Sequence, residues 1–329
     1  MAQRENVTQW RKKCVEAFNE GDEARARALV SQLGARKARS LLEDMLEDPG
    51  VLVRQAAAFG LGELGGAASA KRLERQIALE EARGDYDGAA VVEALTQALG
   101  RVQGASARAS LARRLERLVA AGSRPEPADL NDVACALWRK RHPDLIPVVR
   151  QGLEQLTLPA PTTLHGLLVL LEKSPEELRA WAADGSVSVE LKGEVLTVLT
   201  EEIPESLVST LPSFISSAGP LVDTAVKHKG AASSYCVDLF SLLLLRPEHL
   251  LPRLPEAARF ELRAMARRLV AAISSLKCSL QAAVLLKHLG HPEDAALLEA
   301  HRPAEPVLAK VFDDAAQVLR GLSSPGKIV

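Results

Sequence analysis

The histidines are the residues of this 329-residue chain whose type and spacing best suit metal chemistry. His288 and His291 stand three positions apart with Glu293 nearby, a spacing that could bring two imidazoles and a carboxylate to one metal ion. No further ligand is identifiable. A helix end is the favoured interpretation, since imidazoles there interact well with the helix dipole. We therefore predict no metal site.

Motifs for phosphate binding and acyl transfer are absent from the sequence. It contains no GxGxxG, GxxxxGK[ST] or GxSxG pattern. Gly60, Gly62, Gly65 and Gly66 form a cluster, but they fall inside and just after an expected helix. Helix packing and a helix C-cap explain them better than a ligand loop does. We expect no catalytic residues, no cofactor and no enzymatic activity.

Four cysteines are far apart and form no CxxC pair: Cys14, Cys135, Cys236 and Cys278. In a chain of this length they are best explained as small buried hydrophobes in a reducing compartment. The first residues lack the apolar core of a signal peptide, and the longest apolar runs are far below the ~20 residues of a membrane helix. We expect a cytoplasmic protein without membrane insertion. Its abundant Ala, Leu and Arg suggest a GC-rich bacterium.

Helical patterns recur along the whole chain. Only 3% of the residues are aromatic against 47% hydrophobic, so Leu, Ala and Val supply the core, which favours closely packed helices. A helical hairpin is expected over residues 40–64, with a turn at Asp48-Pro49-Gly50 and a second helix from Val51 to Leu64. One face of that helix reappears 38 residues later, as the following pairs show: Val53 and Val91, Ala57 and Leu95, Gly60 and Ala98, Leu61 and Leu99, Leu64 and Val102.

The segment from Asp48 to Leu64 resembles the HEAT-repeat consensus, with an Asp-Pro turn, Val-Arg, paired alanines and a Leu-Gly near the helix end. The segment from Ala282 to Asp294 resembles the bacterial HEAT-like repeats related to phycobilin lyases. The resemblance implies an all-α solenoid of stacked antiparallel helix pairs, a HEAT-like superhelix. HEAT-like metallo-hydroxylases use repeated His-Glu pairs as iron ligands, and this chain has no His-Glu dipeptide.

The organisation along the chain follows from where the motif is clear. Residues 1–120 are expected to form hairpins with clear HEAT-like repeats, and residues 121–329 to continue as degenerate repeats. Segments 156–163 and 203–220, rich in Pro, Ser and Thr, are candidate linkers, the second being either a subdomain break or an irregular repeat. Pro-Glu pairs indicate helix starts, of which Ser174 with Glu177 predicts a capping box.

The favoured function is a non-enzymatic scaffold that binds another protein. The resemblance implies that the second helix of each pair lines a concave face. The predicted partner-binding residues there are Arg54, Glu63, Glu93, Gln97, Arg101, Trp138, Arg139 and Lys140. Within this set Arg54, Arg101 and Arg139 are expected to line up as a ladder of partner anchors. Arg54 has a structural alternative, a bond to Asp48 or its equivalent in a neighbouring repeat.

Nucleic acid is the second, less favoured partner. The chain has 41 basic and 42 acidic residues, so only a local basic patch could bind phosphates. HEAT-like alkylpurine glycosylases use such a groove, for which this chain offers Lys71, Arg72, Arg75, Arg108, Arg113, Arg114 and Arg117. Trp138 beside Arg139 and Lys140 also suits a nucleic-acid groove, although a buried Trp is favoured. A third alternative is a phycobilin-lyase-like chaperone, suggested by residues 282–294.

Overall fold

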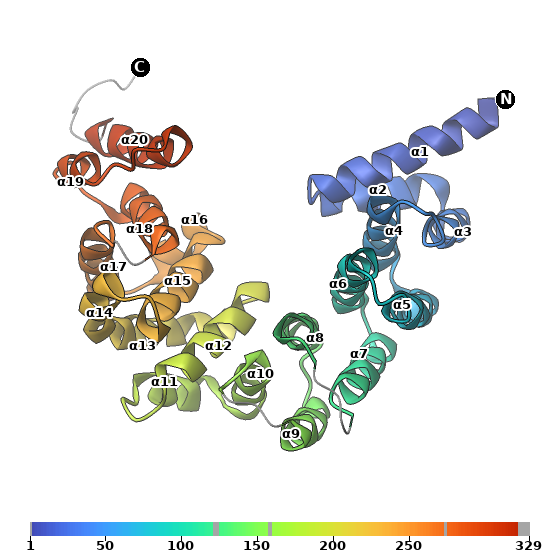
Figure 1. Cartoon of the computed structure of the whole chain (residues 1–329), viewed down its shortest axis with the longest axis horizontal. Helices are drawn as coiled ribbons and strands as arrows, with labels where there is room; N and C mark the ends of the chain where they lie inside the picture. The colour runs from blue at the N-terminus through green and yellow to red at the C-terminus, as the bar shows by residue number, and fades with distance from the viewer. Residues whose placement is uncertain (1, 121–124, 157–159, 273–274, 322–329) are drawn as a thin grey trace. The chain divides into compact units, whose positions relative to one another are not determined.

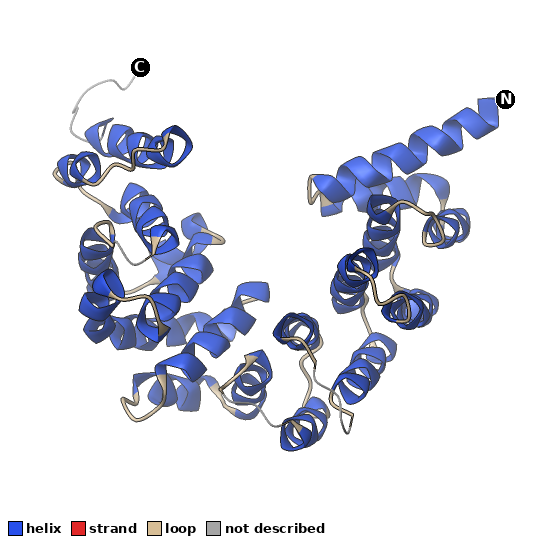
Figure 2. Cartoon of the chain, in the orientation of Figure 1, coloured by secondary structure: helices blue, strands red, loops and turns tan. Residues whose placement is uncertain are grey.

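The computed structural model describes residues 2–120, 125–156, 160–272 and 275–321, with side chains from residue 6 onward. Every regular element within these ranges is a helix (Figure 2). Contacts divide the chain into two compact units, residues 1–171 and 172–329. None of the helices in the described ranges is long and apolar enough to cross a membrane.

Unit 1 consists of helices joined by short turns. Their bounds are α1 (Ala2–Asn19), α2 (Glu23–Leu33), α3 (Ala35–Met45), α4 (Val51–Leu64), α5 (Gly66–Glu81), α6 (Tyr86–Arg101), α7 (Ala105–Leu118), α8 (Pro127–Arg139), α9 (Leu145–Gln155) and α10 (Thr163–Glu172). The predicted linker 156–163 lies partly outside the described residues. Asp22 caps α2 by accepting a hydrogen bond from the Arg25 amide, as its position before the helix predicts.

The helices of unit 1 stack in two rows. Helices α4, α6 and α8 pack one on the next and form the inner row, on the concave side of this unit (Figure 1). Helices α5, α7 and α9 stack in the same way and form the outer row. Helices α1 and α2 pack on α4, and α3 packs on α4 from the outer side. Unit 1 is thus a short solenoid of HEAT-like helix pairs.

Small residues set the spacing of the inner row. A Cβ added to Gly62 of α4 would lie 3.2 Å from the Ala98 backbone of α6, and one added to Gly100 of α6 would lie 3.2 Å from the Ala136 backbone of α8. The same Gly–Ala contact therefore recurs at both inner-row crossings. Close approach of this kind leaves no room for a larger side chain.

Buried ion pairs connect the rows of unit 1. Arg54 of α4 places its Nε 3.0 Å from a carboxylate oxygen of Glu80 in α5, and both side chains are 2% exposed. Arg114 of α7 is buried as well and pairs with Glu81 at the end of α5 and with Asp129 of α8. Each guanidinium is therefore compensated by a carboxylate from a neighbouring helix.

Unit 2 is less regular and contains several short helices. Their bounds are α11 (Pro175–Ala183), α12 (Val189–Glu201), η1 (Glu205–Thr210), α13 (Leu211–Ala218), η2 (Gly219–Leu221), α14 (Val222–Lys227), α15 (Ala231–Leu244), α16 (Pro247–Leu250), η3 (Leu251–Arg253), α17 (Glu256–Leu269), α18 (Leu276–Leu289), α19 (Asp294–Ala300) and α20 (Pro306–Gly321). The capping box of Ser174 and Glu177 at the start of α11 is confirmed. Residues Glu205–Ala218, within the segment 203–220, are helical.

A continuous row also runs through unit 2. Helix α15 packs on α12, α18 on α15, and α20 on α18. Helices α11, α13, α14 and α17 cover this row from one side. Its buried polar groups bond mostly to neutral partners: Lys192 donates to the Asp184 carbonyl at 2.8 Å, and Tyr235 donates to the Phe214 carbonyl at 2.9 Å. The division at residue 171 falls within the region of degenerate repeats, because row contacts rather than motif strength define the units.

Candidate functional site

The outward positions of the inner row recur at a spacing of one repeat. Glu63, Arg101 and Arg139 lie 38 residues apart in the last turns of α4, α6 and α8. The preceding turns supply Phe59, Gln97 and Cys135, again 38 apart, and the turns before those supply Gln55, Glu93 and Asp132. We call these nine residues the inner-row surface. Gln97 and Glu93 are exposed, Phe59 is buried, and the other six are half-buried.

Arg101 is held in place by three neighbouring helices. Its guanidinium carbon lies 4.8 Å from the ring centroid of Phe59, and its Nε lies 3.2 Å from Glu23 at the start of α2. Phe59 in turn meets Phe18 of α1 edge to face, with ring centroids 6.0 Å apart. The ring and the carboxylate fix the direction of the cation, so the charge of Arg101 has a defined place on the surface.

Carboxylates occupy the middle of the inner-row surface. Glu93 accepts a hydrogen bond from Gln97 at 3.1 Å. Burial raises the pKa of Asp132 to about 6, and the negative charges of Glu93 and Asp129 raise it further against the opposing effect of Arg114. This part of the surface therefore changes charge near pH 6, whereas Arg101 and Arg139 stay cationic.

Arg54 does not face a partner, and the predicted ladder of Arg54, Arg101 and Arg139 is wrong. Arg54 is 2% exposed, pairs with Glu80, and donates to the carbonyls of Asp48 and Pro49 at 3.0 Å each. It bonds the backbone of the Asp-Pro turn rather than the Asp48 carboxylate, which accepts from the Gly50 amide. Arg54 belongs to the contact between rows because the fourth residue of α4 turns toward α5. Glu63 takes the place that we assigned to it in the ladder.

Trp138 and Lys140 are also misplaced by the prediction that they face outward. Trp138 is 2% exposed and Lys140 is 8% exposed. The guanidinium of Arg141 lies 5.0 Å from the Trp138 ring centroid and covers it. The indole thus fills the core at the end of α8, the alternative favoured for it above. Among the three neighbours at this helix end, half-buried Arg139 is the one that shares the inner-row spacing.

The predicted basic groove lies on the outer row, and acidic partners neutralise much of it. Its residues belong to α5 and α7. The recorded pairs are Arg72 with Glu47, Arg108 with Asp144, Arg113 with Glu74, and Arg114 with Glu81 and Asp129. A phosphate would have to compete with these carboxylates.

The carboxylate next to the histidine pair is engaged elsewhere. Glu293 bonds Arg263 at 2.7 Å and Arg267 at 3.1 Å, and these two cations hold its pKa below the ordinary value. The His291 amide donates to Asp294 at 2.9 Å, which closes the turn before α19. Within the described ranges, no three His, Cys, Asp or Glu side chains are placed to hold a metal ion.

Phe59, Asp132 and Cys135 belong to the surface but escaped sequence analysis. Stepping 38 residues from Gln97 in either direction would have found Phe59 and Cys135, so a signal existed. Asp132 lies 39 residues after Glu93, and the irregular spacing hides it.

The fold and this surface define an all-α helical-repeat protein built of HEAT-like helix pairs. No protein-family model matches the chain. No curated protein matches it either. Among solved structures it is similar to human deoxyhypusine hydroxylase in complex with glycerol, at 18% identity and a TM-score of 0.36, over 89% of this chain and 99% of that chain. A likeness at this TM-score says nothing about what the chain binds or catalyses.

Proposed function

We propose that the chain is a non-enzymatic scaffold that binds an extended segment of a partner protein along the inner-row surface. The observation that carries the proposal is the periodic placement of Glu63, Arg101 and Arg139 on three helices whose separation is set by repeated Gly–Ala contacts. Such a surface offers evenly spaced anchors to a polypeptide that runs across the helices.

The chemistry of the surface defines the partner's side chains. Arg101 and Arg139 suit carboxylates of the partner, while Glu93 and Asp132 suit a basic or amide side chain one turn away. Arg101 is the strongest candidate anchor, since its position above Phe59 reduces the side-chain entropy lost on binding. Four free thiols support a cytoplasmic setting for this interaction.

Site-specific photocrosslinking tests the proposal. A benzoylphenylalanine at Gln97, exposed on α6, should capture the partner from a lysate of the source organism. The same amino acid at Glu116, exposed on α7 of the outer row, is the matched control and should capture none of it. Equal capture at both positions, or capture at Glu116 alone, would rule out the inner-row surface.

Substitutions then identify the anchors. Replacing Arg101 and Arg139 together by Gln should weaken binding of the captured partner by about tenfold or more, which corresponds to about 1.4 kcal/mol. Arg117→Gln removes an equal charge from the exposed outer face of α7 and should leave the affinity unchanged. The proposal fails if the two kinds of variant bind the partner equally.

Nucleic acid remains the competing partner, and salt dependence separates it from a protein. Phosphate contacts release counterions, so binding to a random-sequence DNA duplex would weaken steeply as salt rises. We expect no such binding even at low salt, because Arg72, Arg108 and Arg113 already have acidic partners. The phycobilin-lyase-like alternative rests on the resemblance of residues 282–294 alone.

A further inference from the structure

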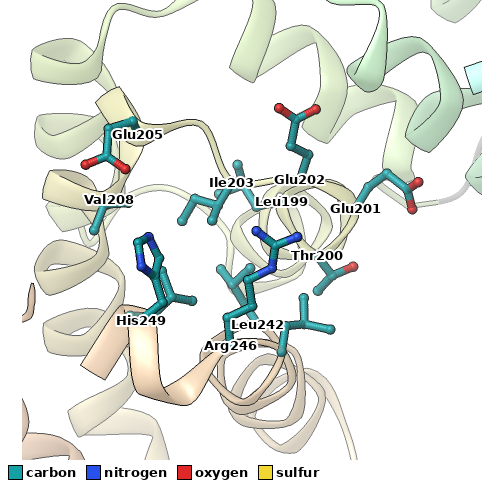
Figure 3. Close-up of a pocket in the computed structure, with 12 residues that line it drawn as sticks. Leu199, Thr200, Glu201, Glu202, Ile203, Glu205, Val208, Leu242, Arg246 and His249 are labelled. Atoms are coloured by element: carbon teal, nitrogen blue, oxygen red, sulfur yellow. The ribbon is translucent and has the colours of Figure 1, made fainter. Parts of the chain in front are cut away.

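A cavity of about 350 Å³ opens in unit 2 where α12 and α15 end (Figure 3). Its volume falls in the range of ~300–1,000 Å³ that is typical of small-ligand sites. The residues lining it come from the end of α12, from η1, and from the end of α15 with α16. All of these elements belong to one unit, so the cavity is complete within it.

The floor of the cavity is apolar. Leu199, Val208, Leu242 and Leu250 are buried in the core and turn part of their surface to the cavity. Leu245 stands beside them and is 55% exposed, unusual for a leucine of a helical core. An aliphatic group entering the cavity would cover this apolar surface and gain about 25 cal/mol per Å² removed from water.

The electrostatic character of the cavity is unequal on its two sides. Glu201, Glu202 and Glu205 lie along the α12–η1 side, and Arg246 and His249 project from the α15–α16 side (Figure 3). Glu205 also pairs with Arg253, which removes part of its charge. The three carboxylates outnumber the single permanent cation that lines the cavity, Arg246.

Helix ends add to this negative character. Helix α12 ends at Glu201 and α15 ends at Leu244, so the C-termini of two helices meet at the cavity. The C-terminal end of a helix carries the equivalent of roughly half a negative charge and favours cations. An apolar floor beneath a negative rim matches a ligand with an aliphatic stem and a positively charged head.

We propose that this cavity binds an organic cation on a short aliphatic stem, an ammonium or guanidinium group. The site is independent of the inner-row surface and goes beyond the scaffold function. Such a group is presented either by a lysine or arginine side chain of a polypeptide or by a free alkylamine. The stem lies on Leu199, Val208 and Leu242, while the charged head faces Glu201 and Glu202 at the rim.

Methyl NMR of the full chain provides the direct test. Ile203 lines the cavity, whereas Ile77 of α5 and Ile215 of α13 are buried elsewhere and serve as internal references. In a chain labelled at isoleucine methyl groups, n-butylammonium should shift the Ile203 signal saturably and leave the references in place. Butyrate, of the same length and opposite charge, should not. A shift of Ile203 by butyrate as large as that by n-butylammonium, or none with either, would overturn the proposal.

Charge substitutions give effects of opposite sign. Glu202→Gln should weaken n-butylammonium binding by about two- to fivefold, the range of an exposed ion pair. Arg246→Gln removes a repelling cation and should strengthen binding by a similar factor. Glu256→Gln, exposed at the start of α17 outside the cavity, is the matched control and should change nothing. If both cavity variants weaken binding, the charge assignment is wrong.

The source of the cation is decided by a second probe. Lysine blocked at both backbone ends carries the same four-carbon amine on a peptide unit. If it shifts Ile203 at concentrations comparable with n-butylammonium, the cavity accepts a side chain of a polypeptide. If the free amine alone binds, the rim excludes the peptide backbone and the ligand is a small amine.

Discussion

Units 1 and 2 build a row of stacked helices by different means. In unit 1 the same Gly–Ala contact recurs at successive crossings, and buried Arg–Glu pairs connect the two rows. In unit 2 the row from α12 to α20 is covered by short helices, and buried polar groups bond to carbonyl and hydroxyl groups. The comparison shows that a helical row does not require the HEAT motif, whereas an evenly spaced surface does.

The two buried cations make the sharpest test of this comparison. Arg54→Met in unit 1 leaves Glu80 buried without its main cation and should lower the free energy of unfolding by about 3 kcal/mol. Lys192→Met in unit 2 leaves no carboxylate behind, since Lys192 donates to the Asp184 carbonyl and the Ser217 hydroxyl. Burial also lowers the pKa of Lys192, so the change should cost less than about 1 kcal/mol.

Urea unfolding with hydrogen exchange resolved by helix measures both variants unit by unit. The double variant Arg54→Met with Glu80→Met is the control and should recover part of the loss, because no buried charge then remains unpaired. Equal costs for Arg54→Met and Lys192→Met would show that the units use buried charge in the same way.

Glycine packing gives the next largest effect. Gly100→Ala would push a Cβ to 3.2 Å from the Ala136 backbone, and Gly62→Ala would do the same against Ala98. Since backbone cannot move aside cheaply, each should destabilise unit 1 by about 1–3 kcal/mol.

Gly193 of α12 is the counterpart in unit 2. A Cβ there would meet a carboxylate oxygen of Asp238 at 3.4 Å, an ordinary contact. Gly193→Ala should therefore stabilise unit 2 by about 0.5–1 kcal/mol through helix propensity. Thermal unfolding of the three variants measures these changes, and destabilisation by Gly193→Ala would show that its row is packed as closely as that of unit 1.

The fold was predictable wherever the hydrophobic period was regular. The expected helix from Val51 to Leu64 is α4, and the all-α class is confirmed. The helix expected from Ser40 starts earlier, at Ala35, because Gly34 with φ of 76° already ends α2 and allows α3 to begin. The division at residue 171 was not predicted, because it depends on contacts between helices that leave no local pattern.

The site was predictable in part, for a related reason. Glu93 and Gln97 are exposed on α6 as the helical period requires. Arg54 was misjudged because its partner Glu80 lies 26 residues away on another helix, and only the packed rows bring the two together. Long side chains near helix ends are decided by such tertiary pairs, so sequence period alone assigns them poorly.

Two buried carboxyl groups extend the comparison to pH. Burial raises the pKa of Asp238 in unit 2 to about 6, with Glu194 raising it and Lys277 lowering it; Asp132 in unit 1 has a similar pKa but is less buried. A carboxyl whose folded pKa lies above its unfolded value near 3.9 stabilises the protein most below pH 4. That stabilisation is lost as pH rises from about 4 to 6.

Asp238→Asn should therefore raise the stability of unit 2 at pH 7 by about 1–2 kcal/mol and flatten its decline between pH 4 and 6. Asp132→Asn should act in the same direction on unit 1, but by about 1 kcal/mol or less after solvent screening. Urea unfolding across this pH range measures both. A stability that rises between pH 4 and 6 specifically because of either aspartate would reverse the assigned sign.

The smallest expected effect concerns Arg101, on which the proposed interface depends. Arg101→Gln loses the cation–π contact with Phe59 and the ion pair with Glu23, and should destabilise unit 1 by about 0.5–1 kcal/mol. Arg268→Gln in unit 2 loses an exposed pair with Asp223 and should cost less than about 0.5 kcal/mol. Thermal unfolding measures both. Because these costs are small, an Arg101→Gln variant that remains folded yet loses its partner would have lost an anchor rather than its structure; a cost above about 3 kcal/mol would instead make Arg101 part of the unit 1 core.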